Sequence, residues 1–430
     1  MADVAQELLA WSSQLVDGDG APAGSTTQPM DARLADFGDG LALVASFSHV
    51  IVLRTDDGLT LVDTSSEAMA GGVQAALRRW SPQPVDTIVY THGHMDHVGG
   101  APRFAEEALS MGARAPRVIA HDAVAGRFSR YEQTDGFNAR INARQFGRIA
   151  LMQAAPERWS IDWVWPTETY AERLEVELAG RPAVLHHDRG ETDDHTWVWL
   201  PETKTILGGD FITWVFPNAG NPQKVQRYPA EWARALHAMA ALSPELYLPA
   251  HGLPIEGRER IARVLSDVAG ALESLVDQTL ALMNAGAPLD EILHSVRVPG
   301  ELADRPYLQA TYDEPEFVVR NIWRLYGGWW DGDAANLKPA PAAKLAAEIA
   351  SLTGGAGPLM DRAVLLSESG EHRLACHLAD FAVRAEETPE NHARRAEVYG
   401  RRRADERSLM AVGVFRAAAE ESAARAQAEV

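Results

Sequence analysis

The amino-acid sequence predicts a layered α/β domain followed by an all-helical region. Two observations support this prediction. Between residues 41 and 249, short runs rich in β-branched residues alternate with segments whose apolar residues recur every three or four positions. After about residue 256 only the helical period remains. Strands that alternate with helices and hairpins are typical of an α/β domain built from stacked layers.

The predicted α/β domain begins with three consecutive strands. Leu41–Ala45, Val50–Arg54 and Leu59–Asp63 are short apolar runs, and the Ser-His and Asp-Asp-Gly segments between them indicate tight turns. Further strands are predicted at residues 85–90, 117–121, 173–178, 183–187, 196–200, 205–207 and 246–249. Helices are predicted at residues 66–80, 102–111, about 138–156, and 231–242.

The C-terminal region is predicted to be helical throughout, and its last part to consist of paired antiparallel helices. Gly370 and the Glu387–Pro389 segment interrupt the helical period. The expected helices are at residues 258–284, 289–296, 316–326, 341–352, 358–367, 373–386 and 389–399. We therefore predict one domain at residues 1–256 and a second, helical domain at residues 257–430.

Composition narrows the class of protein. The chain has 430 residues and a formal charge of −20, which argues against a nucleic-acid partner, because nucleic-acid binding normally shows a basic footprint. The single cysteine, Cys376, excludes an internal disulfide framework and a cysteine-based zinc knuckle, so we expect a metal site to use His, Asp and Glu. The sequence shows neither a signal peptide nor an apolar run long enough to span a membrane, so we expect a cytoplasmic protein.

A dense cluster of potential metal ligands follows one predicted strand. Residues 91–97 read Thr-His-Gly-His-Met-Asp-His, so four potential ligands, His92, His94, Asp96 and His97, lie within six consecutive positions. Burying these side chains without compensation would cost several kcal/mol, and a bound metal compensates them well. The alternative is a solvated polar loop. The position at the end of an apolar strand favours a metal site.

Three later segments could complete the ligand set, and each follows a predicted strand. In Arg189–His195 the candidate is Glu191, with His195, His187 and Asp194 as competitors. Asp210 follows Gly-Gly and could bridge two cations, although it could also cap a helix. His251 follows the strand at residues 246–249. The ends of strands are where an α/β sheet places its chemistry.

In this order the motifs resemble those of the metallo-β-lactamase-fold hydrolases, which implies an αββα sandwich. Glutamate at position 191, in a slot where most members have histidine, is similar to the type III alkyl sulfatases. A second match supports that branch: Pro306–Gln309, Val319–Trp323 and Tyr326–Leu337 resemble the helical dimerisation domain of those sulfatases. Two departures concern the substrate. We expect no C-terminal sterol-carrier-like domain here, and the sulfatases typically have glutamate where this chain has Asp210.

Carried over residue by residue, the resemblance implies two divalent metal ions, zinc first, with manganese or iron as alternatives. The first would be held by His92, His94 and Glu191, and the second by Asp96, His97 and His251, with Asp210 bridging or leaning toward the second. Asp96 and Asp210 are the implied catalytic residues, acting with a hydroxide held between the metals.

Substrate recognition is less sharply indicated. Asn138 and Arg144 lie in a segment that loosely resembles the sulfate-contacting segment of the sulfatases, and Arg227 is a further candidate, because a guanidinium suits sulfate oxygens. Surface arginines on a helix are the alternative. Trp214, Phe216 and Phe137 could line an apolar pocket or belong to the core.

The resemblance implies hydrolysis of alkyl sulfate esters or related small esters by a homodimer, on an anionic small molecule with an apolar part. Another superfamily activity, on a lactone, thioester or β-lactam, is the alternative among enzymes. A catalytically silent metal-binding dimeric scaffold is the alternative from a different class.

Overall fold

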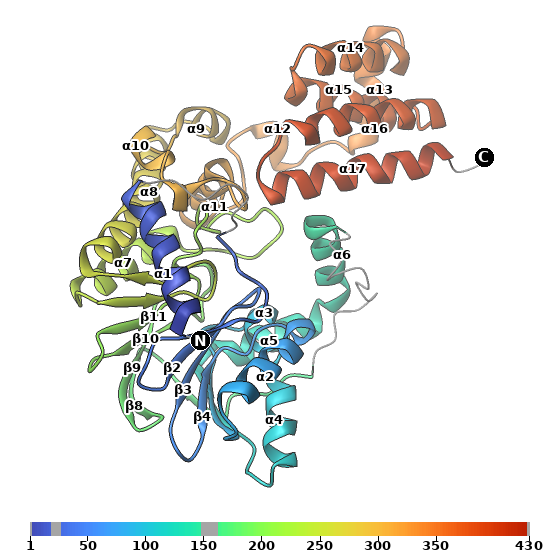
Figure 1. The fold of residues 1–430 in the computed structure, drawn as a ribbon. Coiled ribbons are helices and arrows are strands. Elements are labelled where there is room, and N and C mark those ends of the chain that lie inside the picture. The colour runs from blue at the N-terminus through green and yellow to red at the C-terminus, as the bar shows by residue number, and fades with distance from the viewer. Residues whose placement is uncertain (1, 19–26, 148–161, 428–430) are drawn as a thin grey trace. The chain divides into compact units, whose positions relative to one another are not determined.

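The computed structural model describes residues 2–18, 27–147 and 162–427. The chain divides into two compact units. The first contains residues 1–135, 159–287 and 292–326, and the second contains residues 136–158, 288–291 and 327–430. Figure 1 shows that the first unit holds the sheets and that the second is helical.

Within the described residues, the first unit has two mixed β-sheets. The first has the strand order β1-β2-β3-β4-β5-β6-β7; it is antiparallel from β1 to β4 and parallel from β4 to β7. Its strands are β1 (Leu34–Asp36), β2 (Leu41–Val44), β3 (Val50–Arg54), β4 (Leu59–Val62), β5 (Val85–Val89), β6 (Arg117–His121) and β7 (Glu168–Tyr170).

The second sheet has the order β13-β12-β11-β10-β9-β8, and among these pairs β11 and β12 run parallel whereas the others are antiparallel. Its strands are β8 (Arg173–Leu178), β9 (Arg181–His187), β10 (Thr196–Leu200), β11 (Thr205–Leu207), β12 (Leu246–Leu248) and β13 (Ile255–Glu256).

Alternating side chains of the first sheet fill two separate cores. Val52 and Leu61 pack into a cluster with α2 (Glu67–Trp80), α4 (Ala101–Ser110) and α5 (Ala123–Gln133). Their neighbours Ile51 and Leu53 face the second sheet and pack with Leu185 and Val198. Because both faces are covered, these strands have continuous apolar sequences instead of an alternating pattern.

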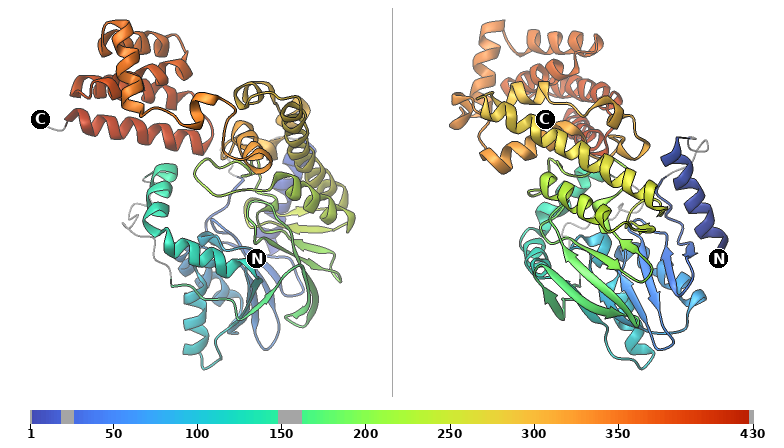
Figure 2. Two further views of the ribbon diagram at one scale, coloured as in Figure 1. Left: turned by 180° about the vertical axis from the view of Figure 1, so that it is seen from behind. Right: turned by 90° about the vertical axis from the view of Figure 1, so that its left-hand side faces the viewer.

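Helices also cover the second sheet, which completes the predicted αββα sandwich. α7 (Pro229–Ala241) packs along α8 (Arg258–Asn284), and α8 contacts β12 and β13 (Figure 2). α1 (Ala2–Asp17) contacts β1 and β13, one edge strand of each sheet. The shorter elements are α3 (Met95–Val98), η2 (Gly209–Phe211), α9 (Leu289–Ser295), α10 (Gly300–Ala303), η3 (Pro306–Leu308) and α11 (Pro315–Gly327).

The second unit is a set of packed helices, as predicted. Successive helices α14 to α17 contact one another pairwise, around small buried residues such as Ala363, Ala375 and Ala379, which let helices approach closely. Gly413 on α17 lies against the backbone of α6, where a Cβ would meet the Gln145 carbonyl oxygen. The helices are α6 (Asp135–Phe146), α12 (Ala334–Leu337), α13 (Ala342–Thr353), α14 (Ala356–Glu368), α15 (His372–Ala385), α16 (Pro389–Ala404) and α17 (Leu409–Gln427).

Most predicted elements are present with bounds shifted by a few residues, and the fold class is confirmed. The predicted helix at 138–156 is described only as α6, since residues 148–161 lie outside the described ranges. The predicted domain boundary after residue 256 falls inside the first compact unit. A compact unit is not the same thing as a sequence domain, so the boundary stays a prediction. Within the described ranges, no helix has the length and apolarity that crossing a membrane requires.

Candidate metal centre

The predicted ligand residues meet where several strands end. The loop after β5 carries His92 and His94, and the short helix α3 carries Asp96 and His97. Glu191 lies between β9 and β10, and Asp210 and His251 follow β11 and β12. Parallel neighbours in a sheet end at the same edge, which explains why residues far apart in the sequence come together.

The structure sorts these side chains into two groups. The first contains His92, His94, Glu191 and Asp210, and the second contains Asp96, His97 and His251. Within each group, one potential ligand atom from every residue lies within 4.8 Å of the others. Six of the seven residues divide as the sequence-based assignment has them, whereas Asp210, expected to bridge or to lean toward the second metal, is grouped with the first set.

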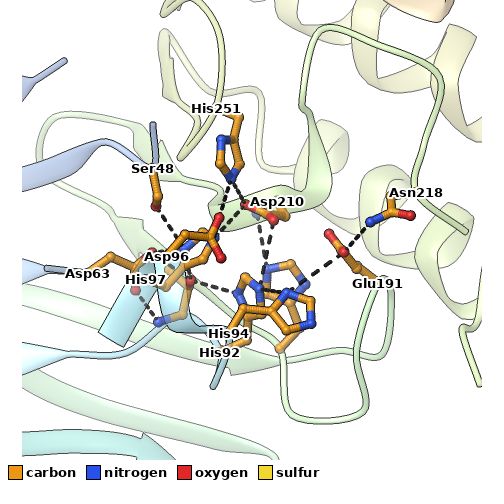
Figure 3. A network of polar contacts seen from close by, with 12 residues as sticks. Ser48, Asp63, His92, His94, Asp96, His97, Glu191, Asp210, Asn218 and His251 are labelled. Atoms are coloured by element: carbon orange, nitrogen blue, oxygen red, sulfur yellow. Dashed lines mark hydrogen bonds and ion pairs between the residues drawn. The ribbon is translucent and has the colours of Figure 1, made fainter. Parts of the chain in front are cut away.

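Asp210 faces both groups (Figure 3). Its Oδ2 lies 3.7 Å from His92 Nε2, whereas its Oδ1 lies 3.4 Å from His97 Nε2 and 3.5 Å from His251 Nε2. One carboxylate oxygen toward each group is the arrangement that a bridging ligand of two cations needs.

Two buried atoms between the ligand groups are suited to bind a cation. Among the described residues, neither His97 Nε2 nor Asp210 Oδ1 has a hydrogen-bond partner, although both are buried. Leaving a buried polar atom unsatisfied costs about 1–3 kcal/mol. A cation bound between an imidazole nitrogen and a carboxylate oxygen would satisfy both atoms, so the residues fit the divalent metals that the sequence predicts.

Asp63 orients His97 from behind. The His97 Nδ1–H donates to Asp63 Oδ2 at 2.7 Å, and Thr91 donates to the same carboxylate from its backbone N–H and its hydroxyl. This bond fixes the proton on Nδ1 and leaves the Nε2 lone pair directed at the centre. Asp63 has φ 61°, a costly conformation for a residue other than glycine, which is common at functional sites.

The loop between His92 and His94 is fixed by buried charges. The Gly93 N–H donates to Asp194 Oδ2 at 3.0 Å, and Arg127 Nε donates to the same oxygen at 2.8 Å. A Cβ at position 93 would lie 2.8 Å from Arg127 Cδ, so glycine is needed for this close approach. Asp194, which the sequence offered as an alternative metal ligand to Glu191, thus fixes the loop that carries His92 and His94.

Glu191 is held by two polar side chains. Asn218 Nδ2 and Arg227 Nη1 each lie 2.5 Å from Glu191 Oε1, and the same oxygen lies 3.8 Å from His94 Nδ1. Burial raises the pKa of Glu191 to about 7, against the opposing effect of the Arg227 charge. A bound cation would favour the ionised carboxylate.

The two competing histidines have other roles. His195 Nε2 accepts a hydrogen bond from the backbone N–H of Asp210 at 3.1 Å, so it supports the bridging residue. Gly209 has φ 53°, and a Cβ there would lie 2.6 Å from His195 Nε2, while a Cβ at Gly208 would lie 1.9 Å from the Tyr247 hydroxyl, which explains the Gly-Gly before Asp210. His187 Nδ1 donates to the His195 carbonyl oxygen at 2.9 Å.

Burial keeps the first two histidines neutral. It lowers the pKa of His92 and of His94 well below the usual value, and neighbouring positive charges, among them His97 for His92 and Arg127 for His94, act in the same direction. Neutral imidazole is the form that binds a metal. The second group is more open, since the Asp96 side chain is 26% exposed.

The predicted substrate residues have different surroundings. Arg227 is buried and ion-paired with Glu191. Asn138 and Arg144 lie on α6, which belongs to the second compact unit. Their roles in binding substrate stay predictions. Trp214 and Phe216 are fully buried, and Trp214 donates to the Leu253 carbonyl oxygen, so both belong to the core. Phe137 is 61% exposed.

Two side chains near the centre were missed from the sequence. Burial lowers the pKa of Lys224 to about 8, and the nearby carboxylates of Asp96 and Glu191 partly offset this effect. Burial raises the pKa of Tyr312 well above its usual value, and the charges of Glu191 and Asp96 reinforce the shift. Neither residue has a local sequence signature, because each comes from a loop far from the histidines in sequence.

Family models match two regions of the chain. Residues 43–251 match the Metallo-beta-lactamase superfamily, and residues 288–425 match the Alkyl sulfatase dimerisation family. A linear primary-alkylsulfatase from Pseudomonas sp. (strain ATCC 19151) is 27% identical over 350 residues, which cover 78% of this chain and 66% of that protein.

Two further comparisons extend these matches. The alpha subunit of a 2,4-dinitroanisole O-demethylase from Nocardioides sp. (strain JS1661) is 25% identical over 314 residues, covering 71% of this chain and 81% of that subunit. The solved structure of the stereoselective inverting sec-alkylsulfatase Pisa1 from Pseudomonas sp. has a TM-score of 0.81 at 22% identity, covering 93% of this chain and 66% of that one.

The chain spans about two thirds of the length of the two alkylsulfatases. The TM-score of 0.81 extends the likeness in fold across both matched regions. The chain is therefore a metallo-beta-lactamase-fold protein that carries an alkyl sulfatase dimerisation domain.

Proposed function

We propose that this chain is a binuclear metal-dependent hydrolase that acts on alkyl sulfate esters or related small esters. The observation that carries the proposal is the position of Asp210, which presents one oxygen to each of two ligand clusters. The substrate class is supported by the alkylsulfatases among the relatives.

The ligand chemistry favours two zinc ions. His92, His94 and Glu191 would hold the first, Asp96, His97 and His251 the second, and Asp210 would contact both. When bound, such cations lower the pKa of water toward about 7 and stabilise negative charge on the reacting oxygens.

The two catalytic carboxylates differ in exposure, which suggests different tasks. Asp210 is only 5% exposed and is fixed from behind by His195, so it can hold its two oxygens in place. Asp96 borders solvent, and its Oδ2 lies 3.4 Å from His251 Nε2. We assign to Asp96 Oδ2 the acceptance of a proton from the attacking water and its transfer to the leaving oxygen as the ester bond breaks. Hydrolysis of the ester then releases an alcohol and hydrogen sulfate.

Recognition of an anionic ester needs positive charge and hydrogen-bond donors near the centre. Lys224 lies within the field of Asp96 and Glu191, and Tyr312 keeps its hydroxyl proton because its pKa is raised by burial and by those carboxylates. Together with Arg227, these residues are our candidates for contacts to the sulfate oxygens. Asn138 and Arg144 remain proposed contacts on α6.

We further propose that the chain forms a homodimer. The Alkyl sulfatase dimerisation model matches residues 288–425, and α13 exposes Leu345 and Leu352, one heptad apart, with 47% and 81% of their surface accessible. Apolar side chains this exposed on one helix are typical of association surfaces.

The test is turnover by metal-replete protein. Purified wild type is supplied with zinc and assayed for sulfate release from hexyl, octyl and dodecyl sulfate, in parallel with a lactone, a thioester and a chromogenic β-lactam. We expect sulfate release that disappears in His97→Ala. Turnover of the lactone, the thioester or the β-lactam without sulfate release would reject alkyl sulfates as the substrate class. Two bound cations without turnover of any substrate would favour the catalytically silent scaffold.

A second candidate substrate is an aryl ether. The likeness to the O-demethylase alpha subunit favours it, because the match covers 81% of that subunit, a larger share than for the alkylsulfatase. Adding water to a methyl aryl ether gives methanol and a phenol. Release of 2,4-dinitrophenolate from 2,4-dinitroanisole by the zinc-loaded protein, without sulfate release from alkyl sulfates, would favour this function.

A further inference from the structure

Within the first compact unit, polar contacts join a long loop after Asp210 to the segment that precedes α11. The Phe216 N–H donates to the Gln309 carbonyl oxygen at 2.9 Å, and the Gly220 N–H donates to Asp313 Oδ2 at 2.7 Å. A Cβ at Gly220 would lie 2.1 Å from the Val318 backbone nitrogen, so the loop and the helix touch through their backbones. This loop also carries Asn218 and Arg227, the two partners of Glu191.

Asn321 on α11 contacts Arg227, which in turn contacts Glu191. Its Nδ2 donates to the Arg227 carbonyl oxygen at 2.9 Å, and its Oδ1 accepts from the Arg227 N–H at 3.3 Å. The Oδ1 also accepts from Gln226 Nε2 at 2.9 Å. The side chain is 6% exposed, so the amide binds the Arg227 backbone in both directions without competition from bulk water.

Arg227 transmits this constraint to the first ligand group. Its Nη1 lies 2.5 Å from Glu191 Oε1 and donates to the Glu191 carbonyl oxygen at 2.9 Å. The guanidinium therefore holds both the side chain and the backbone of Glu191. Arg227 is 3% exposed, so its ion pair with Glu191 is shielded from water. A shift of the Arg227 backbone would therefore disturb a buried ion pair, which costs more than disturbing a solvated one.

A purely structural role does not explain why position 321 on α11 is an asparagine. Asn321 lies beside Val318, Val319 and Ile322, which are buried on α11. Asparagine is a poor helix former, and burying its amide is favourable only when its hydrogen bonds are made. A larger apolar residue would suit packing alone, whereas a side-chain amide can pair with both the N–H and the C=O of Arg227.

We infer that Asn321 is a positioning residue that fixes Glu191 through Arg227, so that a helix inside the matched dimerisation region controls the first ligand group. The inference rests on the proposed function, because it takes Glu191 as a ligand of the first cation. Among the described residues, no hydrogen bond or ion pair joins Asn321 to the second group, which consists of Asp96, His97 and His251. A loss that is confined to one of two cations is therefore the signature of this role.

The experiment measures cation binding in addition to activity. Wild type, Asn321→Leu, Asn321→Asp and Glu191→Gln are equilibrated with zinc of defined free concentration, and bound metal is determined by mass spectrometry. We expect wild type to bind two cations per chain, and Asn321→Leu to bind the first roughly 10–100-fold more weakly while the second is unchanged. Glu191→Gln should show the same selective loss. Asn321→Asp places a buried carboxylate oxygen where Nδ2 now donates to the Arg227 carbonyl oxygen, so it should also weaken the first site.

Arg320→Ala is the matched control, because Arg320 is the exposed neighbour on the same helix and pairs only at 4.0 Å with Glu316. It should bind both cations as wild type does. Wild-type affinity for both cations in the two Asn321 variants would overturn the inference. Equal weakening of both sites together with a large fall in Tm would also overturn it, because that is the result of a general structural role.

The outcome also separates this inference from the proposed function. Wild type that binds two cations but hydrolyses no ester would refute the proposed function, and the selective loss could still be measured. Wild type that binds fewer than two cations would overturn both.

Discussion

Replacing Asp63 with asparagine gives a sharp test of the centre, because the two side chains have nearly the same shape. The Asp63 carboxylate accepts three hydrogen bonds: from His97 Nδ1, from the Thr91 N–H and from the Thr91 hydroxyl. Asparagine also tolerates the left-handed backbone that Asp63 adopts at φ 61°. The substitution therefore preserves the backbone conformation and replaces one carboxylate oxygen, an acceptor, with an NH2 group, a donor.

Either orientation of the new amide disturbs the centre. If its NH2 group faces His97, the imidazole must accept at Nδ1 and carry its proton on Nε2, which removes the lone pair directed at the second cation. If the NH2 group faces the Thr91 N–H instead, two buried donors oppose each other. An unsatisfied buried donor costs about 1–3 kcal/mol. Because about 1.4 kcal/mol corresponds to a tenfold change in an equilibrium constant, we expect the second cation to bind roughly 5–150-fold more weakly.

The assay is competition for zinc between the protein and a chromophoric chelator, which resolves the two affinities. Asp57→Asn is the matched control, since Asp57 is exposed in the turn between β3 and β4. The variant should retain wild-type affinity for the first cation and lose affinity for the second, with a parallel fall in kcat. Two affinities within about twofold of wild type would refute the reasoning that Asp63 sets the tautomer of His97.

Four further outcomes are expected. Removing the cations with a chelator should lower Tm and added zinc should restore it, because a ligand present at a thousand times its Kd stabilises by about 4 kcal/mol; an unchanged Tm in calorimetry would contradict this. Leu61→Ala should lower the free energy of unfolding in urea by about 2–5 kcal/mol, since Leu61 is fully buried between the first sheet and its helices. Burial raises the pKa of Asp313 from its unfolded value of 3.8 to about 7, so the protonated native form contributes stability below pH 3.8 that is lost as pH rises through 7. Asp313→Asn lacks this titration and should therefore gain stability relative to wild type between pH 4 and 7. Unfolding curves measured across that pH range check the sign. Leu352→Glu should weaken the proposed dimer, and light scattering at several concentrations would show more monomer than in wild type.

The ligand set could be predicted because most of its information is local. Four of the ligands lie within residues 92–97, and the strand before them predicts the sheet edge on which they lie. Glu191, Asp210 and His251 each follow a predicted strand as well. The structure brings these seven side chains into two clusters, whereas their role as metal ligands remains a proposal.

The supporting residues could not be predicted because their roles depend on long-range pairing. Asp63 ends β4, and only the parallel pairing of β4 with β5 brings it to Thr91 and His97. Arg227 was interpreted as a substrate contact, since nothing in its neighbourhood indicates Glu191, which is 36 positions earlier. The helix α5 was missed because most of its residues are polar or small: among its buried residues Val124 and Phe128 are apolar, whereas Arg127 is charged.

The charges at the centre explain how an acidic chain could take an anionic substrate. The ligand set contains three carboxylates, Asp96, Glu191 and Asp210, and the histidines of the first group are neutral. Two divalent cations would exceed these three negative charges by one, and Arg227 and Lys224 add further positive charge beside Glu191. The local field would then be positive although the whole chain has a formal charge of −20. A monoanionic ester would be attracted once the cations are bound, but without them it would meet three carboxylates. Substrate affinity should therefore fall when the cations are removed and rise when they are restored. If the cations served only the chemical step, their removal would lower kcat but leave substrate affinity unchanged.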